Sequence, residues 1–153
     1  KFYQKYSGLD ALHKRWIEDV YLRNRIEVFT GRWWPFYLKE KTNRYGETKQ
    51  VLPISDLTNY PIQGTGNDLI CLARISLRNS LTRKKIHGKI VSTVHDSIIV
   101  DTPEVDEVIK EMHGTFNRIP ANVKKMFNYD MSVDFPCEIK VGHNLRFMEK
   151  VTA

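Results

Sequence analysis

The sequence lacks several features that would define its class at once. No apolar run approaches the roughly 20 residues that cross a bilayer, and no charged-then-apolar signal segment opens the chain. These absences predict a soluble, cytoplasmic protein without a membrane partner. Cysteine is scarce, and Cys71 and Cys137 have no C-x-x-C spacing, which argues against a zinc site or a disulfide framework. We interpret both as buried free thiols.

The composition that is present is globular and basic. The 153 residues are 41% hydrophobic, which is enough for one domain with its own core, so we expect a single domain over residues 1–153. The formal charge of +6 favours a polyanionic partner, because Lys and Arg gain affinity by releasing counterions from phosphates. The chain opens on Lys1 within a predicted helix, which favours a piece of a longer polypeptide.

Periodicity predicts the elements of the first 58 residues. An amphipathic stripe predicts a helix from Ser7 to about Arg25. Alternating apolar residues then meet a Thr-Gly-Arg corner at residues 30–32, which predicts a hairpin. The polar residues 39–50 have turn composition and predict an exposed, mobile loop.

The second half is predicted to be a mixture of helices and short strands. A largely buried helix should begin between Pro61 and Thr65, with a capping box from Thr65, and end in the basic residues 82–89. A β-branched hairpin should follow, with its two strands meeting near His95 and Asp96. A helix capped by Thr102, a short helix at 121–127 and a closing strand within 131–143 complete the order. The stripe of the helix after Thr102 should be Val105, Ile109, Met112 and Phe116. This order predicts an α+β fold in which antiparallel strands are backed by helices.

Asp96 is the first candidate for chemistry. A carboxylate at the tip of a hairpin with apolar flanks is held firmly, as a metal-dependent phosphoryl transfer site requires. One carboxylate does not make such a site, and Asp also favours turns simply by bonding its own backbone. Spacing alone leaves both interpretations open.

Two further segments have the composition of a nucleic-acid contact. Asn59 and Gln63 are four residues apart, so their amides would project together from one helical turn, and Gly64 and Gly66 would let another backbone approach closely. Residues 29–41 interleave Arg32 and lysines with aromatic rings, a mixture suited to phosphates and stacking. Both segments are equally compatible with ordinary structure: solvated amides in the first, and core rings with solvated charges in the second.

The order of the motifs resembles a known family. "TGR" at 30–32, "NYPIQGTGNDLI" at 59–70, "VHDS" at 94–97 and "VGHNL" at 141–145 are similar to the last part of family A DNA polymerases, the relatives of bacterial DNA polymerase I and of many phage enzymes. The resemblance extends over nearly the whole chain. It implies an α+β fragment of a polymerase palm, from a bacterium or a phage, acting in the bacterial or phage-infected host cytoplasm.

The resemblance also implies roles for particular residues. Asp96 corresponds to one of two aspartates that bind the catalytic Mg²⁺ ions, and His95 to a residue beside the primer terminus. Asn59 and Gln63 correspond to residues that contact primer and template from the minor groove side, where amide groups test pairing shape with little sequence preference. The implied DNA-binding set is Asn59, Gln63, Arg32, Gly64 and Thr65, and the implied partners are primer-template DNA and a deoxynucleotide.

Departures from the family pattern limit what this chain is expected to do alone. Ser97 stands where many members have Glu, Ser55 where they have Arg, and Trp33 and Trp34 where they often have further Arg. The sequence contains neither the upstream "D-Y-S" aspartate nor the nucleotide-binding Lys of the fingers. We therefore expect an inactive isolated chain that is completed in cis or by a second chain. A non-catalytic nucleic-acid-binding or docking subunit is the alternative, and an exposed face could cause self-association.

Overall fold

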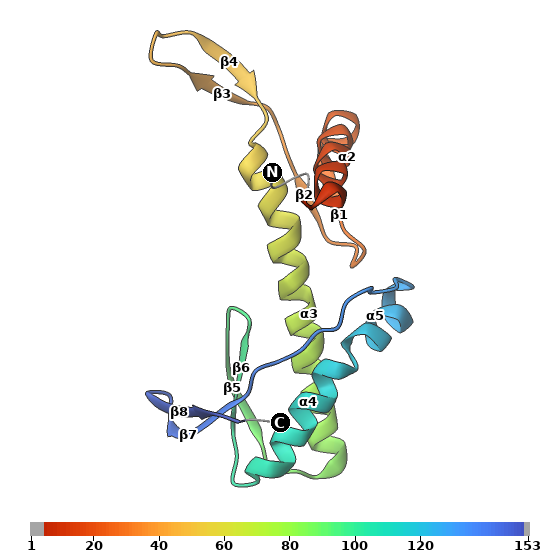
Figure 1. The fold of residues 1–153 in the computed structure, drawn as a ribbon, viewed down its shortest axis with the longest axis vertical. Helices are drawn as coiled ribbons and strands as arrows, with labels where there is room; N and C mark the ends of the chain where they lie inside the picture. The colour runs from red at the N-terminus through yellow and green to blue at the C-terminus, as the bar shows by residue number, and fades with distance from the viewer. Residues whose placement is uncertain (1–4, 152–153) are drawn as a thin grey trace. The chain divides into compact units, whose positions relative to one another are not determined.

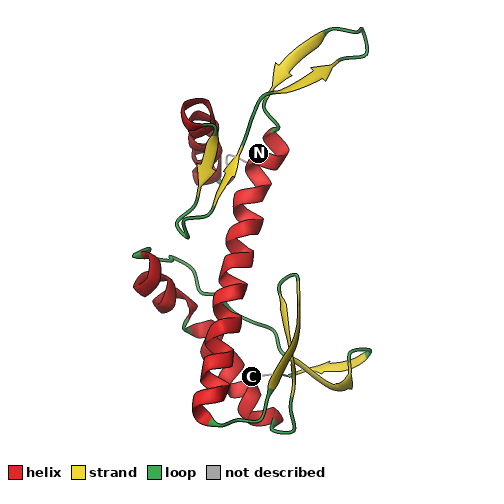
Figure 2. Cartoon of the chain, turned by 180° about the vertical axis from the view of Figure 1, so that it is seen from behind, coloured by secondary structure: helices red, strands yellow, loops and turns green. Residues whose placement is uncertain are grey.

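The computed structural model describes residues 5–151. The chain divides into two compact units, Lys1–Gly66 and Asn67–Ala153, and each is described by itself. The elements that lie wholly within the described residues are four helices and four antiparallel two-stranded sheets (Figures 1 and 2), which confirms the α+β class. None of the helices in this part of the chain is both long and apolar enough to cross a membrane.

The first unit begins with one helix and four short strands. These are α2 (Ser7–Arg23), β1 (Arg25–Glu27), β2 (Trp33–Pro35), β3 (Lys39–Thr42) and β4 (Thr48–Val51), followed by the start of α3 (Ile54–Lys84). Helix α2 ends because Asn24 adopts the left-handed conformation, with φ of 54°, and its N–H bonds to Val20 O. Asn tolerates that conformation better than most residues. The helix and the β1–β2 hairpin are both confirmed close to their predicted limits.

The core of the first unit is aromatic and aliphatic. Its buried members come from α2, the β1–β2 hairpin and the segment that follows it, and the first turn of α3: Trp16, Val20, Ile26, Phe36 and Leu57. Gly31 turns the hairpin with φ of +82°, a conformation that Gly adopts without strain. Figure 1 shows β1 and β2 beside α2, as this shared core requires.

The prediction of a loop at residues 39–50 was wrong. Strands β3 and β4 form a regular hairpin in which Lys39 pairs with Val51 and Thr42 with Thr48. Every residue of both strands is exposed, and Figure 1 shows the hairpin projecting away from α2. The segment is therefore exposed, as expected, but its backbone is paired.

The predicted start of the long helix was also wrong. Helix α3 begins at Ile54, and Pro61 lies inside it. The Thr65 hydroxyl donates to Pro61 O at 2.7 Å, so it bonds back within the helix and does not form the predicted capping box. The first turn of α3 buries Leu57 in the core, and this packing stabilises the helix before Pro61. The helix ends at Lys84, within the predicted basic run.

The second unit follows the predicted order. After the end of α3 come β5 (Lys89–Val94), β6 (Ser97–Asp101), α4 (Val105–Asn117), α5 (Ile119–Phe127), β7 (Lys140–Asn144) and β8 (Phe147–Lys150). In one cluster of the core, α4 and the β5–β6 hairpin pack against the part of α3 that lies in this unit, and Leu77, Leu81 and Val108 are buried there. Figure 2 shows the helices and strands of this unit.

Three details of the second unit differ from the predictions. Helix α4 begins at Val105, and Thr102 accepts a hydrogen bond from Glu104 N in the preceding turn, so it does not cap the helix. Val108, not Val105, lies in the core, although Phe116 is buried as expected. The closing strand predicted over residues 131–143 was wrong for most of that range, since residues 131–139 form no strand and β7 begins at Lys140. The chain reverses after Asn144, whose side chain accepts hydrogen bonds from the N–H groups of Arg146 and Phe147, and β8 pairs with β7.

Candidate functional site

His95 and Asp96 form the two-residue turn of the β5–β6 hairpin. Val94 pairs with Ser97, which confirms that the two strands meet at this point. His95 has φ of 52°, a left-handed conformation that is uncommon outside Gly, although His tolerates it better than most residues. Such a conformation costs on the order of 1 kcal/mol, and strained turns of this kind are concentrated at functional sites.

The base of this hairpin is firmly held while its tip is exposed. Ile90, Ile98 and Val100 pack against the buried core of the unit. Below them, the Thr102 hydroxyl donates to His87 O at 2.6 Å, and the His87 N–H donates to a Glu104 carboxylate oxygen at 3.2 Å. These bonds join the chain entering β5 to the chain leaving β6. The turn is thus presented at the end of an anchored support.

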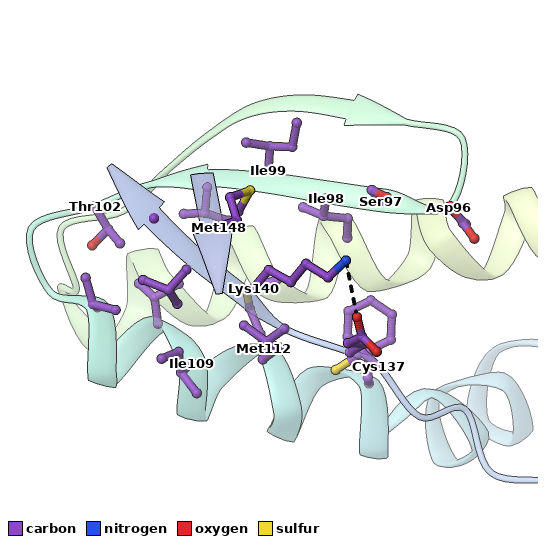
Figure 3. A pocket seen from close by; sticks show the side chains of 18 of the residues that line it. Asp96, Ser97, Ile98, Ile99, Thr102, Ile109, Met112, Cys137, Lys140 and Met148 are labelled. Carbon is purple, nitrogen blue, oxygen red and sulfur yellow. Dashed lines mark ion pairs between the residues drawn. The ribbon is translucent and has the colours of Figure 1, made fainter. Parts of the chain in front are cut away.

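The Asp96 carboxylate faces no neutralising group. It is exposed, and within residues 5–151 it has neither an ion pair nor a hydrogen bond. It lies at one end of a cavity of about 600 Å³ lined by β6, α4 and the 135–148 segment (Figure 3). A carboxylate without a partner at the edge of a cavity retains its oxygen lone pairs for a ligand from solution or from another part of a protein.

The far side of the cavity carries charge and one thiol. Glu138 accepts a hydrogen bond from Lys150 at 2.7 Å and pairs with Lys140 at 3.4 Å, and these contacts, Lys150 first, lower the pKa of Glu138. Cys137 lies 3.8 Å from His113 Nδ1, and burial raises the pKa of its thiol. Both cysteines are free, as predicted, but Cys137 and Cys71 are half-buried and not buried.

The two amide residues lie on α3. Asn59 and Gln63 are exposed and four residues apart in a continuous helix, which places them on one face. Thr65 is half-buried, with its hydroxyl bonded to Pro61 O. These residues belong to the first unit, whereas His95 and Asp96 belong to the second.

Gly64 provides close packing within the first unit. A methyl group at this position would overlap Trp34 Cζ2 and lie 2.7 Å from Trp34 Cη2. The expectation that another backbone approaches Gly64 and Gly66 was wrong: the close neighbour of Gly64 is the side-chain ring of Trp34, a half-buried residue beside the core, and a methyl group at Gly66 would meet nothing within 4 Å. Nearby, Arg32 is exposed in the β1–β2 turn, and its carbonyl accepts from Val28 N at 3.0 Å.

Sequence reasoning missed a buried polar cluster that joins α3 to α4. Glu111 is buried and accepts hydrogen bonds from Ser80, at 2.5 Å, and from Lys84. Together these donors, Lys84 first, lower the pKa of Glu111. The sequence signal available for this cluster is a Glu on the apolar face of a predicted helix. Its hydrogen-bond partners are 27 and 31 residues away, and no local sequence pattern identifies them.

The comparison with known proteins decides the family. Residues 1–146 match the sequence model of DNA polymerase family A. This chain belongs to that family. The match covers both the α3 amides and the β5–β6 turn, so the two groups of candidate residues lie within one family segment.

Curated relatives agree with this membership. The family A chain is 35% identical over 106 residues to a DNA polymerase I of Aquifex aeolicus, a match that covers 60% of the chain. It is 32% identical over 88 residues to a DNA polymerase of Bacillus phage SP01, and 24% identical over 149 residues, or 97% of the chain, to a thermostable DNA polymerase I of Thermus filiformis. The matched segments span only 18%, 9% and 16% of these three relatives.

Membership of this family implies a bound magnesium ion, for which Asp96 is the candidate ligand. Carboxylate oxygen is the donor class that Mg²⁺ prefers, and Mg²⁺ is commonly held by one or two carboxylates together with water and substrate phosphates. Asp96 meets that requirement as a single ligand. In the part of the chain that the structure describes, no group of three or more His, Cys, Asp or Glu side chains is placed to hold a metal. The described residues thus fit one contribution to a magnesium site, but not a whole site.

Proposed function

We propose that the protein is a template-dependent DNA polymerase and that this chain supplies one of its metal-binding aspartates together with contacts to primer-template DNA. The reaction joins the 3′-oxygen of a primer to the α-phosphorus of a deoxynucleotide, breaks the bond to the β-phosphate oxygen and releases pyrophosphate. Bound Mg²⁺ would supply charge stabilisation at the transferring phosphate. The proposal rests on family membership over residues 1–146.

Within this proposal, Asp96 is a metal ligand. One observation carries the assignment: an exposed carboxylate without a partner stands at the turn of an anchored hairpin, beside a His in a strained conformation. Rigid support matters because a ligand that moves by 1 Å loses the geometry on which in-line transfer depends. His95, beside it in the turn, would lie against the primer terminus. The second aspartate and the nucleotide-binding residues would come from another part of the polypeptide or from a second chain.

Asn59 and Gln63 are proposed to contact the minor groove of the primer-template duplex. Their amides are exposed on one face of α3 and can each donate and accept hydrogen bonds. Minor-groove acceptors are nearly the same for every base pair, so donors placed there detect correct pairing without choosing a sequence. Arg32 and Thr65 would support the same duplex, while Gly64 acts through Trp34, which it allows to pack closely.

Primer extension by the full-length protein tests the metal role. Asp96→Ala should lower the extension rate by more than about 10²-fold, since loss of a single preorganised electrostatic group in catalysis costs about 10²–10³. Asp101→Ala is the matched control, because Asp101 is an exposed carboxylate at the other end of β6. It should leave the rate within a factor of a few. Extension by the Asp96 variant at the wild-type rate would refute the assignment.

A binding subunit without catalysis is the second candidate. The net charge of +6 favours it through attraction to nucleic acid, and in the described residues no group of three or more His, Cys, Asp or Glu side chains is placed to hold a metal. Salt-dependent DNA affinity in a full-length protein that extends no primer, with or without added polymerase chains, would establish this candidate in place of the first.

A further inference from the structure

The β3–β4 hairpin, residues 39–51, gathers its lysines on one face. Lys41 lies directly opposite Lys49, and Lys39 lies opposite Val51. Directly paired residues share a face and successive residues alternate, so Lys39, Lys41 and Lys49 lie together on one face. Glu40, Gln50, Thr42 and Thr48 occupy the other face, where the two Thr hydroxyls are 3.0 Å apart. We call residues 39–51 the basic hairpin.

This arrangement does not serve the stability of the hairpin. Like charges directly opposite one another in an antiparallel pair are destabilising. Neither Lys41 nor Lys49 has an ion pair or a hydrogen bond to another side chain in the described part of the chain, whereas Lys39 pairs with Asp56 at 3.4 Å. All eight strand residues are exposed, so no core lies beneath them to offset the repulsion.

The tip of the basic hairpin is nevertheless held by several hydrogen bonds. The Asn43 side chain accepts hydrogen bonds from the N–H groups of Tyr45, at 2.9 Å, and Glu47, at 3.1 Å. Gly46 closes the turn with φ of +81°. This turn places the Arg44 guanidinium 4.8 Å from the centre of the Tyr45 ring, so a fourth cation is held at the tip. The hairpin is thus a shaped support for positive charge.

We infer that the basic hairpin binds the phosphate backbone of double-stranded nucleic acid. Lys39 and Lys41 are two residues apart, about 7 Å along the strand, and share one face of the hairpin with Lys49. A two-stranded ribbon is narrow enough to lie in a duplex groove, and cations aimed at phosphates gain affinity by counterion release. A phosphate between Lys41 and Lys49 would remove the repulsion that the free hairpin carries.

A duplex fits the basic hairpin better than a single strand. Proteins that hold single strands combine cations with exposed aromatic rings on which bases stack. The basic hairpin has one aromatic residue, Tyr45, and the Arg44 guanidinium already lies over its ring. This inference rests on the proposed function for its ligand and adds a DNA contact outside the turn of His95 and Asp96.

Salt-dependent binding of the full-length protein to a fluorescent DNA duplex tests the inference. The Lys41→Gln/Lys49→Gln double variant should reduce the slope of log affinity against log salt by about 2, roughly one for each phosphate contact. Lys110→Gln/Lys125→Gln is the matched control, because it removes the same charge from exposed lysines of α4 and α5. Equal slopes for the two double variants would overturn the inference.

Two further arms separate the remaining explanations. The Thr42→Val/Thr48→Val variant alters the opposite face of the hairpin without changing its charge. If this variant loses as much of the duplex salt slope as the lysine double variant does, hairpin stability and not charge controls binding. For a single strand with the same number of phosphates, the lysine double variant should lose less of the salt slope than it does for the duplex. An equal loss of slope would refute the choice of duplex as the ligand. Primer extension is measured in parallel. If the wild-type protein extends primers normally and the lysine double variant keeps the wild-type salt slope with the duplex, only the hairpin inference fails. If the lysine double variant has a reduced slope but the wild-type protein extends no primer, only the polymerase function fails.

Discussion

Replacing Gly64 with Ala tests the packing of Trp34 on α3. The added methyl group would overlap Trp34 Cζ2 and lie 2.7 Å from Trp34 Cη2, closer than carbon atoms pack, so the ring or the helix must move. Overpacking of this kind costs about 1–3 kcal/mol, and a rigid indole beside the core should place the cost near the upper end. Ala favours a helix over Gly by about 1 kcal/mol. The net expectation is a loss of about 2 kcal/mol in the free energy of unfolding.

Gly66 provides the matched control for this substitution. It lies two residues further along the same helix, and a methyl group there would meet nothing within 4 Å. Gly66→Ala should therefore raise the free energy of unfolding by about 0.5–1 kcal/mol through helix propensity alone. The two substitutions are chemically identical and should have opposite signs.

Urea unfolding followed by tryptophan fluorescence measures both variants. All three tryptophans, Trp16, Trp33 and Trp34, lie in the first unit, so the signal reports on that unit. In a Trp34→Leu background the obstruction is removed, and Gly64→Ala should become stabilising, like Gly66→Ala. The reasoning is refuted if Gly64→Ala stabilises the wild-type protein, or if it remains equally destabilising after Trp34 is shortened.

Three other predictions follow from single contacts. Glu111→Gln should lower stability by about 1–3 kcal/mol at pH 7, because it leaves Ser80 and Lys84 with a weaker acceptor. Because the pKa of Glu111 is lowered in the folded state, its contribution to stability is complete above the ordinary pKa of 4.5 and is lost as the pH falls through the lowered, folded-state pKa. The free energies of unfolding of wild type and variant, measured with urea at decreasing pH, should therefore converge in acid, and a constant difference would contradict this. Gly142→Ala would drive a methyl group into the backbone carbonyl of Phe147, and loss of the β7–β8 hairpin should appear as rapid amide exchange there, whereas wild-type protection would contradict it. Asn59→Ala should weaken primer-template affinity while leaving the Mg²⁺ dependence of extension unchanged, and unaltered affinity in a titration would count against the minor-groove role.

The β5–β6 hairpin shows which parts of the fold could be read from sequence. β-branched residues on both sides of His95 and Asp96 favour extended backbone, and a polar pair between them favours a turn, so local preference and tertiary packing agree. The same agreement explains why α2 and the β1–β2 hairpin were predicted close to their observed limits. The cluster of Glu111 with Ser80 could not be predicted, because no pattern within either helix specifies a partner 31 residues away.

Two elements were mispredicted because local signals conflicted with packing. Pro61 normally marks a helix start, yet α3 extends back to Ile54, because Leu57 in its first turn is buried in the core. Residues 39–50 have loop composition because no face of the β3–β4 hairpin is buried, and apolar alternation is the signal by which strands are recognised. A fully exposed hairpin therefore cannot be recognised from apolar alternation.

The departures from the family pattern carry information of their own. The ring of Trp34, at a position where the family resemblance leads us to expect Arg, lies against Gly64 of the α3 segment that carries Asn59 and Gln63. An Arg at this position could contact phosphate, whereas the Trp packs against the core. The positive charge absent there is available a few residues later, on the exposed face of Lys39, Lys41 and Lys49. If the basic hairpin binds duplex DNA as inferred, this chain combines in neighbouring segments a packed support for α3 and a separate contact for the phosphate backbone.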